Sequence, residues 1–386
     1  MKKKRITGVF ALLLWAVASC VYPYEAEVLD DSEQWLVVEG DIIANDITTV
    51  KLSKTNLLDL AYYPPVERAL VYVEDERQGR YPAVETAPGQ YEAQTQNLDL
   101  SLRYRLYIEL IGKKTYASGF MPVSVSPPID SIGYVVNPTQ TAIDIHVSTH
   151  DSQGKSRYYK WDYIENWEIH SSMASPLMYD EARGIIVERP VEKNLYYCWA
   201  QQSSTGINLG STVRLQEDIV DRNTVLTIWE HDHRTQALYA IKMSQKVLTV
   251  EAYTYWEQLR KNSEDIGGIF SPQPSEFRGN IYSLNNPDER VLGYISASTL
   301  SYSERIFIPG GILARPVITC DWRLSFPVGH EYAADEMTEL HKYGYNPVDY
   351  FVMDGIRFTR WWGSACTDCR VYGTKDKPSW WPNDLF

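Results

Sequence analysis

Four cysteines in the second half of the chain could take part in three different chemistries. Cys366 and Cys369 have the Cys-x-x-Cys spacing of redox centres and of half a zinc site, whereas Cys198 and Cys320 are single. A redox centre needs this motif at the start of a helix in a βαβ unit, and zinc needs two further ligands. The surrounding Gly and Pro residues favour neither context. We therefore predict structural disulfides, paired Cys366–Cys369 and Cys198–Cys320, with metal binding and redox chemistry as the alternatives.

The histidines are the next candidates for chemistry. His231 and His233 flank Asp232, and on a strand both imidazoles would share a face, as a metal pair requires. Two solvated side chains in a turn explain the pattern equally well, because it directly follows a predicted strand. His146 and His150 lack a carboxylate cluster and are expected at the surface. No Gly-x-Ser-x-Gly, His-Glu-x-x-His or phosphate-binding glycine motif occurs. We predict no catalytic residues, no bound metal and no cofactor.

Cys20 has the setting for covalent lipid attachment. Lys2, Lys3, Lys4 and Arg5 precede an apolar run at residues 6–18, which is shorter than the roughly 20 residues that span a bilayer. This arrangement is typical of a secretory signal peptide. It ends in Val17-Ala18-Ser19-Cys20, which resembles the bacterial lipobox, whose cysteine is acylated after cleavage. An ordinary signal peptide with an incidental cysteine is the alternative. We predict residues 1–19 as a lipoprotein signal peptide and Cys20 as the lipid attachment site.

The charge of the chain excludes one class of partner. Residues 1–19 hold four of the 37 Lys and Arg residues, so the predicted mature chain has 33 basic and 50 acidic residues, a net charge of −17. Such a field repels phosphate backbones, so nucleic-acid binding is not expected. The aromatic residues are 28 Tyr, 12 Trp and 9 Phe. Amphipathic rings suit sheets and binding surfaces alike, so this excess does not discriminate between them.

The first part of the mature chain has the sequence pattern of short β-strands separated by turns. Residues 20–34 are polar, acidic and without periodicity, which is typical of a tether. From Trp35 onward, short β-rich runs alternate with turn signals and show no helical period. We predict an N-terminal β-sandwich over residues 35–122, followed by a linker rich in Pro, Ser and Val. The β-rich runs are 35–40, 48–52, 69–74, 89–92, 101–111 and 115–118.

A second, larger β-rich domain is predicted over residues 128–386. Residues 142–149 alternate between apolar and polar, and further β runs follow. Apolar residues at three- and four-residue steps predict one helix near 247–262, ending before Gly267-Gly268. The chain after residue 308 has no clear period, so we expect an irregular C-terminal layer held by the cysteines. The predicted fold is mainly β, with two β-sandwich domains of the immunoglobulin or transthyretin kind.

Tryptophan groups are the best candidates for a binding surface. Trp161, Tyr163 and Trp167 share one predicted strand face, where an inter-sheet core is favoured over a ligand surface. Exposure is expected for Trp380-Trp381, because the pair lies on a tail bounded by Pro. Adjacent exposed Trp residues commonly contact a ligand or a partner protein. The predicted partner-binding residues are Trp361, Trp362, Trp380 and Trp381.

Several stretches, in order along the chain, match one family pattern. The most specific is Asn286-Pro287-Asp288-Glu289-Arg290-Val291-Leu292-Gly293-Tyr294-Ile295. The others are Leu36-Val37-Val38-Glu39-Gly40, Thr49-Val50-Lys51-Leu52-Ser53, Tyr158-Tyr159-Lys160-Trp161, Glu165-Asn166-Trp167-Glu168, Gly267-Gly268-Ile269-Phe270, Pro274, Gly279-Asn280-Ile281-Tyr282, Cys366-Thr367-Asp368-Cys369-Arg370, Gly373-Thr374 and Lys377-Pro378-Ser379-Trp380-Trp381. Together they cover nearly all of the mature chain and resemble a Bacteroidota outer-membrane lipoprotein family, domain-of-unknown-function family 4249. Tyr372 stands where the family pattern has Gly.

The resemblance implies a role in transport and no catalytic residues. Such families are typically encoded beside TonB-dependent receptors, so the expected protein is lipid-anchored in the outer membrane. It would be an accessory or binding subunit of a nutrient transporter with a receptor barrel as its partner. A free-standing adhesin, or a glycan- or peptide-binding lipoprotein, is the alternative, and a hydrolase comes third.

Overall fold

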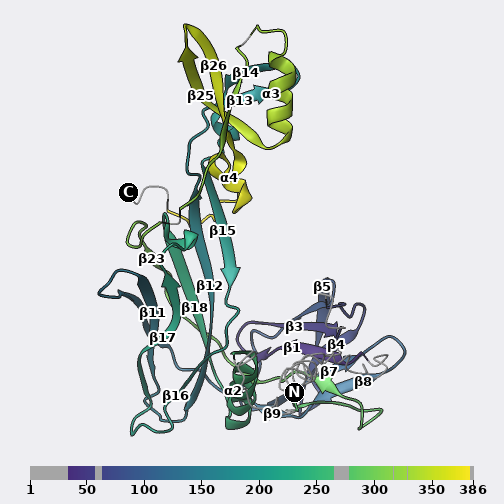
Figure 1. The fold of residues 1–386 in the computed structure, drawn as a ribbon. Helices are drawn as coiled ribbons and strands as arrows, with labels where there is room; N and C mark the ends of the chain where they lie inside the picture. The colour runs from purple at the N-terminus through teal and green to yellow at the C-terminus, as the bar shows by residue number, and fades with distance from the viewer. Residues whose placement is uncertain (1–33, 57–62, 265–277, 316, 328, 383–386) are drawn as a thin grey trace, which may run out of the picture.

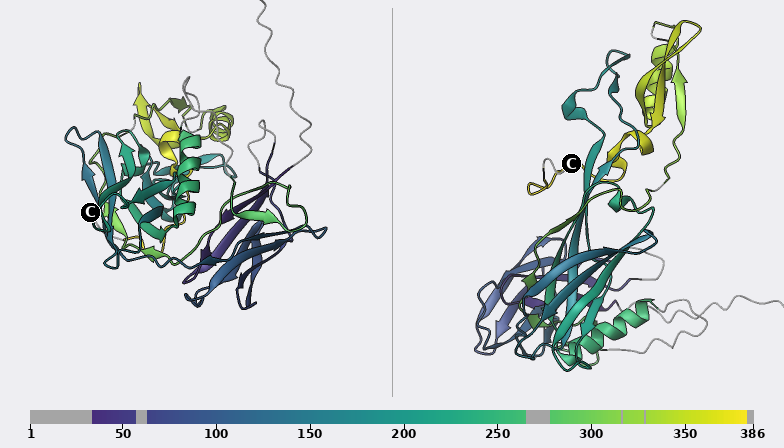
Figure 2. Two further views of the ribbon diagram at one scale, coloured as in Figure 1. Left: turned by 90° about the horizontal axis from the view of Figure 1, so that it is seen from below. Right: turned by 90° about the vertical axis from the view of Figure 1, so that its left-hand side faces the viewer.

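The computed structural model describes residues 34–56, 63–264, 278–315, 317–327 and 329–382. Figure 1 shows an elongated molecule with two β-rich units side by side at one end and a slender lobe at the other. Figure 2 shows the same two units from below and the projecting lobe from the side. The predicted signal peptide, Cys20, the tether up to residue 33 and Gly267-Gly268 lie outside the described residues. In the described part of the chain, no helix is long and apolar enough to cross a membrane.

The N-terminal unit is a sheet built from strands with alternating burial. In β3, Thr48, Val50 and Leu52 are buried whereas Ile47 and Lys51 are exposed, as the period of two predicts. The strands follow one another in space in the order β19-β8-β7-β4-β5-β6-β3-β1-β20, with β9 beside β7. They are β1 (Leu36–Gly40), β3 (Ile47–Lys54), β4 (Leu70–Asp75), β5 (Arg80–Ala87), β6 (Gln90–Gln94), β7 (Arg103–Glu109), β8 (Thr115–Ser118), β9 (Met121–Pro122), β19 (Ile281–Ser283) and β20 (Val291–Leu292).

This sheet curls until its two ends nearly meet. Its end strands, β19 and β20, belong to one later segment, so the sheet is a nearly closed, barrel-like structure. Next to it, β2 (Ile42–Ile43) pairs in parallel with β21 (Ala297–Ser298). The later segment also places Ile281, Ile295 and Ala297 in the core. The N-terminal unit is therefore not built from residues 35–122 alone, because residues 281–298 complete its sheet.

The second unit consists of two sheets that share one core. One sheet has the order β10-β11-β17, and the other β15-β12-β18-β22 with β16 beside β12 and β23 beside β18. Trp161, Tyr163 and Trp167 are buried in the shared core, which confirms the core interpretation of this strand. The strands are β10 (Ile129–Val136), β11 (Ala142–His150), β12 (Tyr158–His170), β15 (Tyr197–Ser203), β16 (Asn208–Ser211), β17 (Ile219–Trp229), β18 (Tyr239–Val247), β22 (Ser301–Tyr302) and β23 (Ile306–Ile308).

The predicted helix is present but begins three residues later than expected. Helix α2 spans Val250–Glu264, because Val247 is still the last residue of β18. The hydroxyl of Thr249 accepts a hydrogen bond from the backbone N–H of Ala252 at 3.3 Å, which marks the helix start. Ala252 is fully buried and packs in a small cluster with Leu209 and Leu248. The helix thus covers one end of the second unit.

The C-terminal part is an ordered lobe, and the prediction of an irregular covering layer is wrong. A separate sheet of order β24-β26-β25 packs with helix α3 and the β13–β14 hairpin at the far end of the long strand β12 (Figure 1). The elements are β13 (Leu177–Asp180), β14 (Ile185–Glu188), β24 (Trp322–Ser325), α3 (Ala333–Lys342), β25 (Tyr345–Met353), β26 (Ile356–Gly363) and α4 (Ser364–Thr367). Three short 3-10 turns, η1 (Val191–Lys193), η2 (His233–Thr235) and η3 (Cys369–Val371), complete the described elements.

Candidate partner-binding surface

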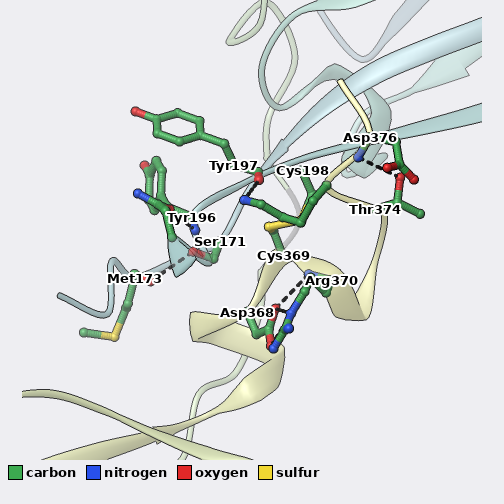
Figure 3. Close-up of a disulfide and its surroundings, with 12 residues drawn as sticks. Ser171, Met173, Tyr196, Tyr197, Cys198, Asp368, Cys369, Arg370, Thr374 and Asp376 are labelled. Carbon is green, nitrogen blue, oxygen red and sulfur yellow. Dashed lines mark hydrogen bonds and ion pairs between the residues drawn. A yellow bond between two sulfur atoms is a disulfide. The ribbon is translucent and has the colours of Figure 1, made fainter. Parts of the chain in front are cut away.

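The four cysteines hold the neck between the lobe and the second unit. They form the disulfides Cys198–Cys369 and Cys320–Cys366, so the predicted pairs Cys366–Cys369 and Cys198–Cys320 are wrong. Cys198 lies on β15 and Cys369 on η3, as Figure 3 shows. Cys366 lies on α4, and its disulfide to Cys320 links α4 to the segment that precedes β24. All four sulfurs are used in structural bridges, as the even cysteine count predicted.

The backbone explains why the two close cysteines do not pair with each other. Asp368, between them, is in an extended conformation, so Cys366 and Cys369 belong to two separate helical turns. The N–H of Cys369 donates to the carbonyl of Leu195 at 2.9 Å, and Met173 N–H donates to the carbonyl of Cys366 at 2.8 Å. Each cysteine is therefore fixed against a different part of the second unit or neck.

The predicted partner-binding tryptophans lie in two different environments. Trp361 is fully buried and packs against Tyr179, Ala333 and Met337 inside the lobe. Trp362, the next residue on β26, points to the opposite face, since side chains alternate along a strand. Its ring lies 6.3 Å from that of Trp322, between ring centroids. The adjacent pair therefore supplies one core residue and one half-buried residue on the opposite face of the sheet.

The Trp380-Trp381 pair is divided in the same way. Trp380 is 37% exposed, and the guanidinium of Arg305 lies 3.3 Å from its ring centroid. Trp381 is only 3% exposed, and its indole N–H donates to Glu168 Oε2 at 3.0 Å. The expected exposure is thus confirmed for Trp380 and wrong for Trp381, because the tail folds back and buries the second ring beside Leu238 and Ala240.

The outer face of the β24-β26-β25 sheet is an apolar surface that the sequence did not predict. Cross-strand partners share a face of a sheet, so Trp322 with Trp362, Phe351 with Phe358, and Met353 with Ile356 all lie on this side. Trp322, Phe351, Met353 and Ile356 are 47%, 39%, 48% and 48% exposed. We call this side of the sheet the open face. It consists of Trp322, Phe351, Met353, Ile356, Phe358 and Trp362, with the Asp349–Arg360 ion pair at its centre.

Residues at the tip extend the apolar surface around the hairpin edge. Val352 is 61% exposed and lies on the other side of β25 from Met353. On that side, the guanidinium of Arg357 lies 3.8 Å from the ring centroid of Tyr350. Tyr, Trp, Phe, Met and Arg are the residue types enriched at protein interfaces. The surface has the composition of a contact site for another protein.

One sequence signal could have found this hairpin. Asp354-Gly355 separates the two strands, and both residues have positive φ, 52° and 74°. This conformation is the tight turn that Asp-Gly favours between antiparallel strands. The open face follows from that turn, because it fixes the register of β25 against β26. Reading residues 309–386 as irregular therefore missed Trp322, Phe351, Met353, Ile356 and Phe358.

The histidines do not form a metal-binding group. Among the described residues, no three His, Cys, Asp or Glu side chains come together as a metal site would require. Asp232 instead pairs with Arg234, with Oδ2 and Nη2 at 2.7 Å. His231 contacts the carbonyl of Arg315, and the ring of His233 faces Trp167. His150 contacts Asp130 at 2.7 Å, and this hydrogen bond raises the pKa of His150 at the surface.

Comparison with known proteins gives one family match. The sequence pattern of a family described as "Domain of unknown function (DUF4249)" matches residues 21–303. That stretch includes most of the two β units and the β13–β14 hairpin. The strands β24, β25 and β26, which form the open face, follow the matched region. No curated protein matches the sequence.

Proposed function

Because the chain belongs to the DUF4249 family, whose description assigns no activity, we propose a function from its surfaces. The proposed protein is a lipoprotein of the outer membrane that acts as an accessory or binding subunit of a TonB-dependent nutrient transporter. The observation that carries the proposal is the open face, an exposed apolar sheet surface at the far end of an elongated molecule (Figure 1). Such surfaces on soluble domains commonly mark sites of protein contact.

The proposed anchor and the open face would act together. Acylation of Cys20 would hold the protein at the membrane, with residues 21–33 between the anchor and the first described residue. A fully extended tether of this length reaches about 45 Å. Confinement raises the effective concentration of a neighbouring membrane protein, so a modest contact surface would suffice for stable association. We therefore propose that the partner is an integral membrane protein, the receptor barrel.

The contact would use side chains that are large, apolar and already held in place. Trp322 and Trp362 lie together at one end of the open face, and Met353 and Ile356 at the other. Arg360 pairs with Asp349 between them and is therefore already neutralised. Large side chains around a satisfied polar centre lose little further entropy on binding, and Trp and Arg are frequent binding hot spots.

We also infer an architecture for the second unit from the same packing. Its two sheets enclose one core that includes Ile145 of β11, Trp161 of β12 and Ile228 of β17. Face-to-face sheets around one apolar layer favour a β-sandwich as the scaffold that carries the lobe. The lobe then projects from the ends of β12 and β15, away from the anchored unit.

Co-purification tests the proposal. The full-length protein with its own signal peptide should bring down a receptor barrel from membranes solubilised in detergent. The variant Met353→Ser/Ile356→Ser should lose that partner, because it removes two exposed apolar contacts from the open face. The matched control Val84→Ser/Ile111→Ser changes two residues that are 67% and 70% exposed on the N-terminal unit, and it should keep the partner. A wild-type protein that purifies alone would contradict the transporter role and favour the adhesin alternative.

A further inference from the structure

Strand β10 ends the sheet β10-β11-β17 and has one edge without a partner strand. Within the described part of the chain, β10 pairs with β11 alone. Strands β11 and β17 of this sheet lie on the side of the second unit away from the N-terminal unit (Figure 1). From residue 131 to residue 136 the register with β11 is unbroken, so the free edge is regular there. Such an edge presents backbone N–H and C=O groups to a further strand.

The hairpin after β10 shows which backbone groups point to this edge. The N–H of Asn137 donates to the carbonyl of Ala142 at 3.0 Å, so the backbone of Asn137 faces β11. Backbone groups alternate between the two edges of a strand, with a period of two residues. Ile132, Tyr134 and Val136 therefore direct their N–H and C=O groups away from β11. Among the described residues, these groups have no hydrogen-bond partner.

The side chains along this edge are uncharged and mostly apolar. Ile132 and Val136 pack partly into the core of the second unit, whereas Tyr134 between them is 37% exposed. On the opposite face of the strand, Val135 is 50% exposed. The charged residue of β10, Asp130, lies at the register shift before residue 131. On a chain with 50 acidic residues, residues 131–136 thus form a neutral strip.

Two other long edge strands carry features that hinder pairing. Native proteins protect free edges with charges, prolines and bulges. Strand β17 contains Asp221 and Arg222, Arg222 has a φ of 44°, and the register with β11 shifts at two places. Strand β25 contains Pro347 and a register shift before Asp349. Residues 131–136 of β10 contain none of these features, so this edge can accept a further strand.

We propose that β10 pairs with β10 of a second copy of this chain, antiparallel and about a twofold axis at Tyr134. This register uses every free group, because Ile132 faces Val136 of the other copy and Tyr134 faces its own counterpart. The two Tyr134 rings become cross-strand neighbours, and no charged side chain faces another over residues 131–136. A second copy fits because its strand has the same uncharged length and the same spacing of free groups. The contact occupies the edge of both copies, so it closes as a dimer. It is independent of the open face and of the proposed transporter role.

Cysteine crosslinking of the full-length protein in detergent tests the register. In a hydrogen-bonded antiparallel pair the two Cα atoms lie about 5.5 Å apart, a separation that a disulfide can bridge. Tyr134→Cys should therefore form a disulfide-linked dimer under mild oxidation. Tyr343→Cys is the matched control, because Tyr343 is 77% exposed in the lobe and lies far from β10 in the fold. It should remain monomeric under the same conditions.

A second pair of variants measures the strength of the contact. Tyr134→Lys places two ammonium groups opposite each other at the axis and should weaken dimerisation at least about tenfold in sedimentation equilibrium, whereas Tyr343→Lys should leave it unchanged. Equal melting temperatures of the two variants show that the monomer is intact. A wild type that stays monomeric up to roughly 200 µM, unchanged dimerisation of Tyr134→Lys, or equal crosslinking of the two cysteine variants each overturns the proposal. A monomeric wild type whose β10 edge binds a strand of a different protein overturns it as well.

Discussion

Lys246 of β18 and Asp41, which follows β1, form a buried ion pair that joins the second unit to the N-terminal unit. Each side chain is 8% exposed, and the two residues are 205 positions apart in the sequence. Lys160 lies beside Lys246 in the register of β12 and β18, and its Nζ lies 2.6 Å from Asp162. Two lysines and two aspartates thus share one region, with the ring of Trp256 5.1 Å from the Lys160 ammonium.

The two lysines respond in opposite directions to this environment. Desolvation lowers the pKa of Lys160, and the neighbouring charge of Lys246 lowers it further. Desolvation also opposes the charge on Lys246, but attraction by Asp41 and Asp162 outweighs it and raises the pKa of Lys246. The Asp41–Lys246 pair is therefore a buried charge contact between the two units in which both partners are held ionised.

Breaking this pair should destabilise the junction strongly. Lys246→Met removes the ion-pair partner of the buried Asp41, which is expected to lower the free energy of unfolding by about 3–5 kcal/mol. Adding Asp41→Asn should recover part of the loss, because the amide oxygen can still accept from the Ser296 N–H, now at 3.0 Å. Urea denaturation measures the free energy of unfolding of the single and the double variant. Lys242→Met, on the same strand, is the control with an expected loss below about 1 kcal/mol. Equal losses for Lys242→Met and Lys246→Met would contradict this interpretation.

Trp381 should hold the C-terminal tail on the second unit. Trp381→Ala removes a buried ring and its hydrogen bond to Glu168, a loss of about 3–5 kcal/mol for the docked tail. The tail should then open, and trypsin should cleave after Lys375 much faster than in the wild type, whereas the Lys377–Pro378 bond resists trypsin in both. Trp380→Ala, at a 37% exposed position, should change the cleavage rate far less. Cleavage at the wild-type rate in Trp381→Ala would show that the tail is held by other contacts.

The same contact predicts a loss of stability in acid. The hydrogen bond from His170 lowers the pKa of Glu168, burial opposes the shift, and Trp381 adds to the lowering. Because the folded pKa lies below the usual 4.5, the stabilisation is complete above about pH 5 and is lost as the pH falls through the folded pKa. The difference in unfolding free energy between wild type and Glu168→Gln should therefore shrink from pH 6 to pH 3. A constant difference over this range would contradict the assignment.

Local sequence patterns were sufficient to predict the strands and the helix that have one buried face and one exposed face. Val50 and Leu52 alternate with exposed neighbours, so β3 was predictable, and the spacing around Tyr253 and Trp256 located α2. The closing strand β20 and strand β21, which pairs with β2 in a separate sheet, have two residues each, too few to show a period. Strand β5 was not predicted because it contains Pro82, and proline within a run of residues argues against a strand.

Long-range relationships could not be derived from those patterns. Four cysteines allow three pairings, and only the tertiary path of the chain through the neck selects Cys198–Cys369. Adjacency of tryptophans did not show which ring of each pair faces the core: Trp361 and Trp381 are buried, and the exposed Trp322 was not among the predicted residues. The open face depends on the register of three strands, and the closure of the N-terminal sheet depends on the return of β20 to β1 from a distant part of the chain.

The disulfide pairing makes a direct prediction for peptide mapping. Endoproteinase Asp-N cleaves before Asp368 and so separates Cys366 from Cys369. Without reduction, the Cys198 peptide should remain linked to the Cys369 peptide, and the Cys320 peptide to the Cys366 peptide. Removing Cys320–Cys366 by double Ser substitution opens a loop of 46 residues, for which the chain-entropy estimate is about 4 kcal/mol.

The loss of stability in Cys320→Ser/Cys366→Ser should be confined to the lobe. In Cys320→Ser/Cys366→Ser, amide hydrogen exchange should rise over β24, β25 and β26 and stay unchanged in β3 and β6 of the N-terminal unit, because no contact of that sheet depends on the bridge. Cys198→Ser/Cys369→Ser should instead raise exchange in β15 and in the tail that follows η3, since Trp199 and Thr374 exchange backbone hydrogen bonds beside that bridge. A Cys366–Cys369 peptide, or equal exchange in both variants, would contradict the pairing and its division of roles.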